Sequence, residues 1–268
     1  MHPLLDFGLA QVPGLYARLV ALRRPPNVEK IIFLTLVRRG DTVLDVGANT
    51  GYYTLLFSHL AGSQGRVHAF EPVAPTFSLL ASHVKRKGAF DNIVLNERAL
   101  ADRAGPVSLL VPDTDLAQAA LVRHAAGSWE YAETIEAHAG NAITLDEYAA
   151  GLPALDFLKC DVEGAERLVL QGGEAAIRRF RPMLFLEICP DWTTSFGYEP
   201  AEIVQFLADL GYDRFYLADE ELHLLTKPES ELARLRVSAN LLCAIRERHA
   251  DRLERLRPWL TDGTGGAE

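Results

Sequence analysis

Cysteine is scarce in this sequence: 268 residues contain three, Cys160, Cys189 and Cys243. An odd number at wide spacings fits neither a disulfide framework nor the paired spacing of a zinc knuckle. Each cysteine lies in an apolar run, so we expect three buried, reduced thiols. Reduced thiols are typical of the cytoplasm, which is the location we predict.

Long hydrophobic runs are missing as well. No apolar stretch approaches the roughly 20 residues that a membrane span requires. Residues 1–24 lack a basic stretch ahead of their apolar part, and Asp6 and two prolines interrupt them, which is unlike a signal peptide. We expect a packing helix here, with an amphipathic helix at a membrane interface as the alternative.

Positive charge is in deficit, with 27 Lys and Arg against 36 Asp and Glu and a net charge of −9. So acidic a chain lacks the broad positive face that binding along a nucleic-acid backbone requires. Two short basic clusters, residues 85–87 and 178–181, are interpreted as solvated helix ends. We therefore predict a small-molecule partner, no nucleic acid and no membrane span.

What the sequence does contain is an alternation of strand and helix patterns from residue 42 onward. Apolar runs predict strands at residues 42–46, 66–70, 92–96, 156–160, 183–188, 213–217 and 241–245. Helical patterns lie at residues 52–61, 75–87, 165–180 and 200–210. Such alternation predicts an α/β fold with a seven-stranded, mostly parallel sheet and helices on both faces. No clear helix separates the last two strands, so we expect the last strand to be antiparallel.

The chain divides into three parts around this sheet. Residues 1–40 form an N-terminal helical segment that could pair two chains in a homodimer, residues 41–250 form the sheet domain, and residues 251–268 form a C-terminal tail. We expect the end of this tail, residues 261–268, to be disordered. An insertion at about residues 106–145 precedes the fourth strand, and long insertions at the working edge of a sheet are typical of substrate loops or lids.

The insertion also carries His124 and His138, which we interpret as surface polar residues. Aromatic side chains in this and a later loop either wall a substrate pocket or pack the loops down: Trp129, Tyr131, Trp192, Phe196 and Tyr198. The substrate would be selected by residues 112–141 and 190–199, whose composition names no ligand.

The stretch VLDVGANTGYY joins the first strand to the first helix of the sheet. In open parallel sheets, ligands bind beyond the carboxyl ends of the strands, where this turn lies. Gly47 and Gly51 allow a close backbone approach that a Cβ atom would block, and the helix points its N-terminus at the ligand. Glu71 ends the second strand, where an acid can accept two hydrogen bonds from a ribose diol. These residues predict a cofactor that contains a nucleoside.

The spacing of the glycines separates two classes of cofactor. Dinucleotide folds use G-x-G-x-x-G, whereas this loop is G-x-x-x-G with Asp45 two residues ahead of it. A carboxylate there would repel a pyrophosphate and would suit the ammonium or sulfonium group of S-adenosylmethionine. We therefore predict S-adenosylmethionine, and we keep two alternatives: a nicotinamide-dependent oxidoreductase and a non-catalytic cofactor-binding scaffold.

Acidic residues gather at the ends of the fourth and fifth strands. The fourth strand runs into KCDVEGAE, which places Asp161 and Glu163 in a turn, and Glu187 ends the fifth strand. Because neighbouring strands lie about 5 Å apart, Asp161 and Glu187 share one pocket if the two strands are adjacent. These carboxylates could hold and deprotonate a substrate hydroxyl, or they could bind a divalent metal. Glu166 is interpreted as a helix N-terminal cap, and Lys159 as either an ion-pair partner or a substrate contact.

Five segments resemble the FkbM family of methyltransferases in order and spacing: VLDVGANTGYY (43–53), AFEP (69–72), ITLDEY (143–148), DFLKCDVEGAE (156–166) and FLEI (185–188). The resemblance covers about residues 40–217, and DVEGAE is its most distinctive piece. It implies a Rossmann-like class I methyltransferase fold and S-adenosylmethionine as the methyl donor. It also implies O-methylation of a hydroxyl on a secondary metabolite or a sugar-containing molecule.

The resemblance further implies a role for single residues. The methionine end of the cofactor would be lined by Asp45, Gly47, Asn49 and Gly51. The ribose would be held by Glu71, the adenine edge would meet Ala99 and Leu100, and Asp161 would lie beside the reactive methyl. The adenine amino group would then bind Asp102 or backbone groups. The predicted cofactor site is completed by Ala48, Tyr52, Thr54 and Pro72, and the predicted catalytic residues are Lys159, Asp161, Glu163 and Glu187.

Overall fold

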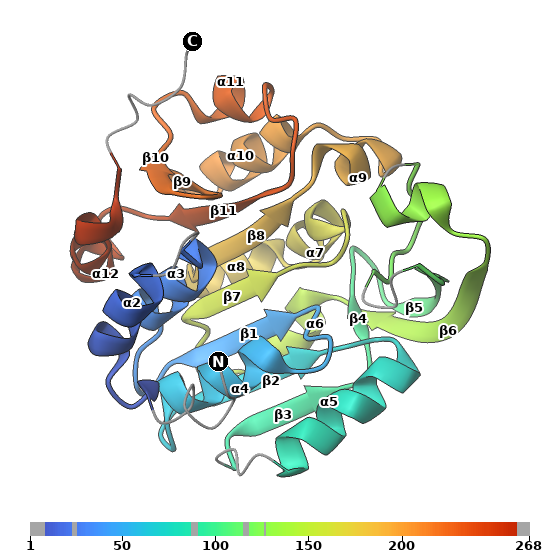
Figure 1. The fold of residues 1–268 in the computed structure, drawn as a ribbon, viewed down its shortest axis with the longest axis horizontal. Coiled ribbons are helices and arrows are strands. Elements are labelled where there is room, and N and C mark those ends of the chain that lie inside the picture. Colours follow the sequence, from blue (N-terminus) through green and yellow to red (C-terminus); the bar gives the residue numbers. More distant parts are fainter. Residues whose placement is uncertain (1–8, 23–25, 87–90, 115–117, 126, 262–268) are drawn as a thin grey trace.

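The structure is a computed structural model that describes residues 9–22, 26–86, 91–114, 118–125 and 127–261. Its main sheet has eight strands in the order β10-β9-β11-β8-β7-β1-β2-β3 (Figure 1). These strands are β1 (Thr42–Val46), β2 (Arg66–Phe70), β3 (Ile93–Asn96), β7 (Phe157–Cys160), β8 (Met183–Ile188), β9 (Arg214–Ala218), β10 (Leu222–Leu224) and β11 (Ala239–Ala244). The predicted α/β fold of the class I methyltransferase type is confirmed.

The five neighbouring strands β3, β2, β1, β7 and β8 pair in parallel. β11 is antiparallel to both of its neighbours, β8 and β9. The predicted antiparallel last strand is therefore confirmed. The sheet has one strand more than the expected seven, because residues 222–224 fold back on β9 as a short hairpin. This segment is only three residues long, too short to stand out in a polar stretch of sequence.

Helices cover both faces of the main sheet (Figure 1). One face packs against α2 (Pro13–Ala21), α3 (Val28–Leu36), α4 (Tyr52–Ala61) and α12 (Ala250–Leu256). The other face packs against α6 (Leu145–Ala149), α7 (Glu166–Gln171), α8 (Glu174–Phe180) and α10 (Pro200–Asp209). Consecutive strand residues alternate between the two cores, as Phe157 and Leu158 do, so the central strands are buried on both sides. α5 (Ala74–Arg86) packs through Leu80 against Ala48 and Ala69.

The last helix belongs to the folded core and is not a tail. Arg252 of α12 donates two hydrogen bonds of 2.7 Å to the carboxylate of Asp41 and a third to the carbonyl of Leu36. A short 3-10 helix, Arg257–Trp259, follows. The prediction of a tail from residue 251 is wrong, because these contacts hold α12 against α3. Residues 262–268, most of the stretch expected to be disordered, lie outside the described residues.

The predicted helix at residues 165–180 is two helices, α7 and α8, separated by Gly172 and Gly173. A Cβ atom on Gly172 would lie 2.0 Å from the carbonyl oxygen of Ala101, and one on Gly173 would lie 2.4 Å from the side chain of Leu145. The glycine pair therefore allows two other segments to approach the break closely.

The insertion forms a second, three-stranded sheet in the order β4-β6-β5. Its strands are β4 (Ala99–Leu100), β5 (Gly105–Pro112) and β6 (Ile135–Ile143), and a 3-10 helix, Gly127–Tyr131, lies between the last two. The third strand of the main sheet thus ends at Asn96, and Leu100 belongs to this second sheet. α9 (Pro190–Ser195) and α11 (Pro228–Leu232) complete the described helices. Across the described residues, the helices are too short or too polar to cross a membrane.

Candidate active site

A cavity of about 330 Å³ lies at the carboxyl ends of β1, β2, β7 and β8. The main sheet contributes strand ends and the turns after them to its lining: Val46, Gly47, Asn49, Phe70, Glu71, Pro72, Asp161, Val162, Glu163, Ala165 and Glu187. The rest of the wall comes from the second sheet, the insertion and α9: Arg98, Ala99, Leu100, Leu109, Gln118, Ala119, Leu121 and Trp192. The cavity thus lies between the main sheet and the insertion, the location predicted for a substrate loop.

Glu71 is fixed at this cavity by the two loops that border it. Its Oε2 accepts a hydrogen bond of 3.0 Å from the backbone N–H of Asn49, and its Oε1 accepts one of 2.9 Å from the N–H of Val73. Burial raises the pKa of Glu71 to about 7, although both backbone hydrogen bonds oppose the increase. Each oxygen retains a second lone pair, so the carboxylate can accept hydrogen bonds from a diol.

Gly47 allows the first loop and the turn after β7 to touch. Its φ is +79°, and a Cβ atom there would lie 1.8 Å from the carbonyl oxygen of Asp161. Asn49, with a φ of 48°, is also in the left-handed region, and its N–H is the one that reaches Glu71. The turn therefore uses two unusual backbone conformations to orient its N–H groups.

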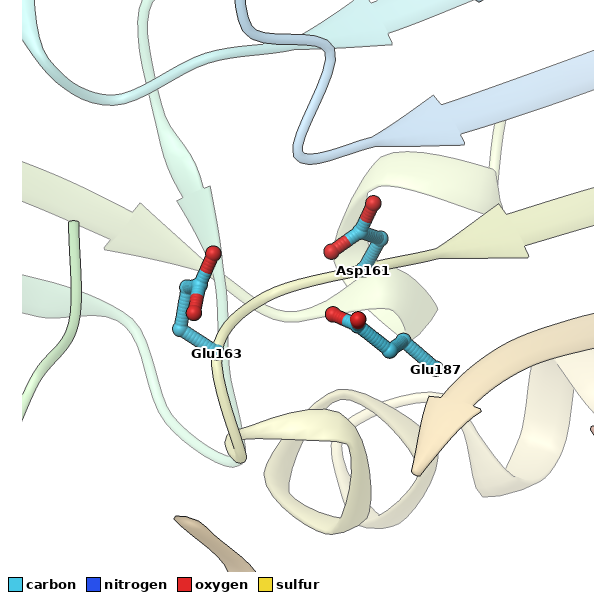
Figure 2. A group of neighbouring side chains, drawn as sticks. All are labelled: Asp161, Glu163 and Glu187. Atoms are coloured by element: carbon cyan, nitrogen blue, oxygen red, sulfur yellow. The ribbon is translucent and has the colours of Figure 1, made fainter. Parts of the chain in front are cut away.

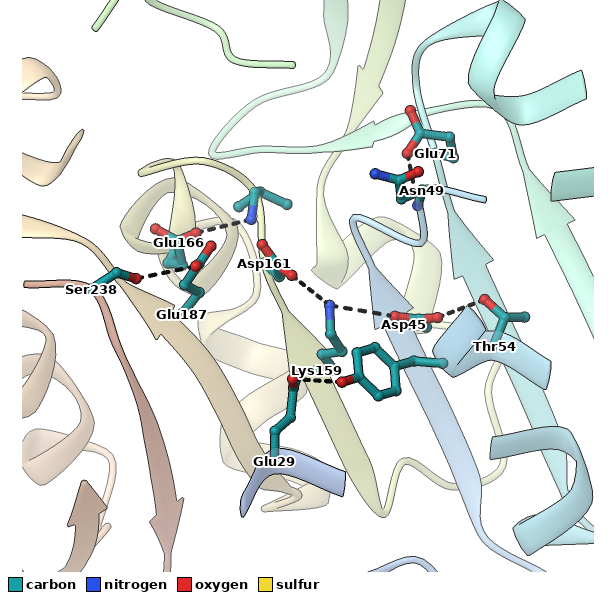
Figure 3. Close-up of polar contacts among 12 residues, drawn as sticks. Glu29, Asp45, Asn49, Thr54, Glu71, Lys159, Asp161, Glu166, Glu187 and Ser238 are labelled. Atoms are coloured by element: carbon teal, nitrogen blue, oxygen red, sulfur yellow. Dashed lines mark hydrogen bonds and ion pairs between the residues drawn. The ribbon is translucent and has the colours of Figure 1, made fainter. Parts of the chain in front are cut away.

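A buried ion cluster lies beneath the cavity (Figure 3). Asp45 of β1 and Lys159 of β7 are register partners on adjacent strands, and both are almost fully buried. Lys159 Nζ lies 2.9 Å from Asp161 Oδ2 and 3.9 Å from Asp45 Oδ1. Asp45 Oδ2 accepts a 2.6 Å hydrogen bond from Thr54. Two carboxylates therefore share one lysine, and Lys159 is an ion-pair partner, one of the two roles that the sequence left open.

The N-terminal helix α3 extends this polar cluster. Glu29 accepts a 2.6 Å hydrogen bond from the hydroxyl of Tyr53, whose ring lies 5.6 Å from Lys159 Nζ (Figure 3). Burial raises the pKa of Glu29, while the charge of Lys159 opposes the shift. Residues near the start of the chain therefore contribute to the charge balance under the cavity.

Three carboxylates meet at the cavity wall: Asp161, Glu163 and Glu187 (Figure 2). One ligand oxygen from each lies within 4.8 Å of the other two. Asp161 and Glu187 are hydrogen-bonded to each other, as expected for residues on the adjacent strands β7 and β8. The predicted shared pocket of these two acids is therefore present, and Glu163 joins it.

The two hydrogen-bonded acids differ in their pKa values, so one of them holds a proton and the other is ionised. Burial and the neighbouring charge of Asp161 raise the pKa of Glu187 to about 10. Lys159 overcomes the burial of Asp161 and lowers the pKa of that carboxyl. Near neutral pH the proton therefore stays on Glu187, which donates to an ionised Asp161. Ser238 on the other side donates a hydrogen bond of 3.1 Å to Glu187 Oε1.

The turn that carries Glu163 is held from above by His124 of the insertion. His124 Nε2 lies 2.9 Å from the carbonyl oxygen of Glu163, whose φ of 56° is rare for a residue with a side chain. The imidazole stacks on Trp192 with ring centroids 5.4 Å apart, and Trp129 packs edge-on against it. The prediction of a surface His124 is wrong, because two tryptophans bury it. His138 is only partly buried and lies beside Glu136.

Among the other loop aromatics, Trp192 walls the cavity, whereas Trp129, Phe196 and Tyr198 pack the loops. Tyr131 is exposed. Glu166 is buried in the first turn of α7, where the helix dipole favours a carboxylate, but the N-cap residue is Ala165. Glu166 instead accepts a 2.9 Å hydrogen bond from the N–H of Val162 in the turn before the helix.

The predicted cofactor residues divide into two groups. Those that line the cavity are Gly47, Asn49, Glu71, Pro72, Ala99, Leu100 and Asp161. Those that do not are Asp45, Ala48, Gly51, Tyr52 and Thr54, together with Lys159 of the predicted catalytic set and the proposed adenine contact Asp102.

The contacts of Asp45, Ala48, Gly51 and Tyr52 explain why these residues lie outside the lining. Asp45 lies inside the sheet, where Lys159 and Thr54 hold its carboxylate, so it acts below the cavity. Ala48 and Gly51 pack toward Leu80 of α5. Tyr52 points toward the N-terminal segment and accepts a 2.6 Å hydrogen bond from Lys30.

The sequence interpretation missed two parts of the site. Arg98, Gln118 and Leu121 line the cavity from segments without a motif. The position of Arg98 directly before Ala99 was the only signal available. The contribution of Glu29 was missed because no local pattern links α3 to β7.

The chemistry of the lining fits S-adenosylmethionine. Glu71 offers carboxylate oxygens at the end of β2, where a ribose diol is bound in nucleoside sites. Leu100, Leu109 and Leu121 supply apolar surface for a flat ring. The ionised Asp161 would supply negative charge for a bound sulfonium. The carboxylate trio also has the oxygen donors that a divalent metal prefers, and metal binding there stays a prediction.

Comparisons with known proteins agree with this fit. The family model "Methyltransferase FkbM domain" matches residues 45–214. The 31-O-demethyl-FK506 methyltransferase FkbM of Streptomyces tacrolimicus is 31% identical over 165 residues, which are 52% of this chain and 62% of that protein. A probable cobalt-precorrin-6B C(15)-methyltransferase (decarboxylating) of Saccharolobus solfataricus is 35% identical over 75 residues, 26% of this chain and 38% of that protein. The chain thus spans less than two thirds of the length of both relatives.

Among solved structures, methyltransferase FkbM from Methylobacillus flagellatus KT is similar with a TM-score of 0.48 and 14% identity, over 89% of this chain and 58% of that one. The match of the family model covers well over half of the 268 residues. This chain therefore belongs to the FkbM methyltransferase family, whose members depend on S-adenosylmethionine.

Proposed function

We propose that this chain transfers the methyl group of S-adenosylmethionine to a hydroxyl of a small molecule. The observation that carries the proposal is the pairing of Glu71 with the acids Asp161 and Glu187 on the walls of one cavity. Glu71 would hold the ribose, and Asp161 and Glu187 would then face the transferred methyl. The name of the Streptomyces relative, a 31-O-demethyl-FK506 methyltransferase, supports an oxygen acceptor.

The bound cofactor would supply an electrophilic methyl group on a sulfonium, so the protein mainly needs to orient the acceptor for in-line attack. A hydroxyl acceptor must also lose its proton. Because Glu187 holds a proton and Asp161 is ionised, Asp161 is the group able to accept a hydrogen bond from the hydroxyl. Glu187 would fix the orientation of the Asp161 carboxylate. The proton would pass to Asp161 as the new O–C bond forms and the S–C bond to the methyl group breaks, which would leave S-adenosylhomocysteine.

The nicotinamide-dependent oxidoreductase and the non-catalytic scaffold have no support in the comparisons. A calorimetric titration distinguishes them from the proposal. We expect S-adenosylhomocysteine to bind and NADH not to bind, and Glu71→Ala to weaken binding of the former about tenfold or more, because it removes two charged hydrogen bonds.

The acid pair is tested by methyl transfer from isotope-labelled S-adenosylmethionine to a panel of sugars and polyketide alcohols. Each compound is paired with its deoxy or amino counterpart. We expect labelled methyl ethers from the alcohols only. Asp161→Asn should lower kcat about 100-fold or more while S-adenosylhomocysteine still binds.

Asp191→Asn, which changes an acid of α9 outside the cavity lining, is the matched control and should keep wild-type turnover. Near-normal turnover in both Asp161→Asn and Glu187→Gln would remove the catalytic role of the pair. Label found only on the amino compounds would remove the hydroxyl acceptor. The cytoplasmic location and the homodimer stay predictions.

A further inference from the structure

A second cavity, of about 250 Å³, lies at the opposite end of the main sheet. Its lining consists of Arg38, Asp156, Arg181, Arg248, His249, Asp251 and Arg252, and we call it the arginine cavity. Asp156 directly precedes β7, Arg181 lies two residues before β8, and Arg38 lies four residues before β1. The arginine cavity is thus at the amino ends of the strands, a strand length of about 15 Å from the carboxylate trio.

The charge of the arginine cavity is opposite to that of the protein. Four arginines face two aspartates in a chain whose net charge is −9. His249 adds no charge: burial lowers its pKa to about 4, and both ring nitrogens are engaged, Nδ1 with the N–H of Ile245 and Nε2 with the carbonyl of Arg181. Even when Asp41, the partner of Arg252, is included, the positive charges exceed the negative ones by one.

Two of the four guanidinium groups are largely committed to the fold. Arg252 binds Asp41 in a bidentate manner, and Arg248 donates hydrogen bonds of 3.0 and 2.8 Å to the carbonyls of Arg181 and Phe180. They therefore shape the cavity and raise its potential.

The other two guanidinium groups keep donors available. Arg38 pairs with Asp251 through Nη1, while its buried Nε and Nη2 have no hydrogen-bond partner within the described part of the chain. The Arg181 guanidinium is exposed, and it makes no hydrogen bond or ion pair with the residues that the structure describes. Buried polar groups normally have partners, so the two unused buried donors of Arg38 indicate a missing acceptor beside the cavity.

The backbone of Arg181 is held in an unusual conformation. Its φ of 50° is left-handed, and its carbonyl accepts hydrogen bonds from both Arg248 and His249. Glycine would be the least strained residue at such a C-terminal helix position. The two side chains that bind its carbonyl therefore fix the position of Arg181 at the cavity.

We propose that the arginine cavity binds a phosphate monoester or orthophosphate through Arg38 and Arg181. The planar guanidinium presents paired N–H donors that match two phosphate oxygens, and a dianion would neutralise the excess positive charge. The phosphate could belong to a soluble metabolite or to a lipid headgroup, which carry the same chemistry. The site is separate from the methyl-transfer cavity and does not depend on the proposed function.

The test uses the full chain and two probes. Inorganic phosphate is measured by equilibrium dialysis, and vesicles of phosphatidylcholine with phosphatidic acid are measured by co-sedimentation. We expect saturable binding of one phosphate per chain. Arg181→Gln should weaken it about tenfold or more, because it removes charged hydrogen bonds. Vesicle binding that free phosphate displaces would assign a lipid source, and binding of free phosphate alone would assign a soluble one.

The matched control is Arg86→Gln, which removes the same charge from an exposed position on α5. It should bind phosphate as the wild type does. Binding of S-adenosylhomocysteine reports that each variant is folded. Arg38→Gln removes the second proposed phosphate ligand and should also weaken phosphate binding. No saturable binding of either probe, or equal binding by Arg181→Gln and Arg86→Gln, would overturn the proposal.

Discussion

The two ends of the main sheet contain the same local arrangement. At each end a buried histidine lies within hydrogen-bond distance of the carbonyl of a residue with a positive φ. His124 Nε2 lies 2.9 Å from the carbonyl oxygen of Glu163, and His249 Nε2 lies 3.0 Å from that of Arg181. Each arrangement stabilises a strained turn beside a cavity. Strain of this kind persists only where surrounding contacts impose it.

The two histidines differ in how completely they are bound. His249 also accepts a hydrogen bond from Ile245, whereas Nδ1 of His124 is buried without a partner among the described residues. His249 joins two elements of the folded core, while His124 joins the core to the insertion. The amino end is therefore the more firmly stabilised one. The carboxyl end, where we place the methyl transfer, holds its wall with fewer contacts.

The ends also differ in the balance of charge. At the carboxyl end, Lys159 is the cation paired with both Asp45 and Asp161. At the amino end, arginines outnumber acids and use backbone carbonyls as additional acceptors. Removal of a cation should therefore lower the free energy of unfolding much more at the carboxyl end than at the amino end.

The largest expected effect is that of Lys159→Met. The substitution keeps the length of the side chain but leaves Asp45 buried without its cation, at a cost of about 3–5 kcal/mol in the free energy of unfolding. Arg252→Met at the amino end should cost about 2 kcal/mol, because Asp41 keeps the N–H of Arg38 and lies nearer to water. Urea unfolding measures both.

Lys85→Met, at an exposed position of α5, is the control for the lost charge and should change stability by less than about 0.5 kcal/mol. If Arg252→Met lowered the free energy of unfolding as much as Lys159→Met, the claim that the carboxyl end depends more strongly on a single cation would be wrong.

The next effect is the pH dependence of Glu187→Gln. The pKa of Glu187 is raised from 4.5 to about 10, so the folded protein holds a proton that the unfolded chain releases. The wild type should therefore lose stability as the pH rises from about 4.5 toward 10. Glutamine mimics the protonated acid and carries no proton to lose. The variant should match the wild type near pH 4 and become progressively more stable than it at higher pH.

Unfolding free energies between pH 4 and 9 test this sign. Glu220→Gln, at an exposed position, should stay parallel to the wild type. Parallel curves for Glu187→Gln would mean that Glu187 is already ionised in the fold, and Asp161 would then no longer be distinguished as the proton acceptor.

Local sequence patterns located seven of the eight strands of the main sheet but not the ion cluster beneath it. The strands at 42–46, 66–70 and 183–188 were predicted with correct ends, because a mainly apolar run or an apolar alternation is followed by a turn at each of them. Asp45 was assigned to the cofactor because it stands inside a nucleotide-loop motif. Its actual partner, Lys159, is 114 residues away in sequence and faces it only through the register of β1 and β7.

The insertion was the hardest segment for the same reason. β5 and β6 pair over eight residues, yet Pro106, Pro112 and a run of small residues obscure their alternation. His124 had no periodic context, so nothing in its neighbourhood indicated burial between two tryptophans. The break between α7 and α8 depends on the carbonyl of Ala101 approaching Gly172, a contact that no window of residues around the glycine contains.

His249→Ala should cost about 2 kcal/mol in the free energy of unfolding. The substitution leaves the N–H of Ile245 and the carbonyl of Arg181 with one hydrogen bond fewer inside the core, and it opens a small cavity. Urea unfolding measures the loss, and His223→Ala, at a partly exposed position of β10, serves as the control. A cost below about 0.5 kcal/mol would contradict the structural role of His249.

His124→Ala is the smallest expected change and distinguishes the two ends most directly. It removes one contact with the carbonyl of Glu163 and the stacking on Trp192, so the global cost should be about 1 kcal/mol or less. The loss should instead appear locally, as faster chymotrypsin cleavage after Tyr131 or Trp129 of the insertion, while His249→Ala leaves that cleavage unchanged. Equal global costs for the two substitutions, without a change in cleavage, would show that both histidines serve only the core and that the carboxyl end is as firmly closed as the amino end.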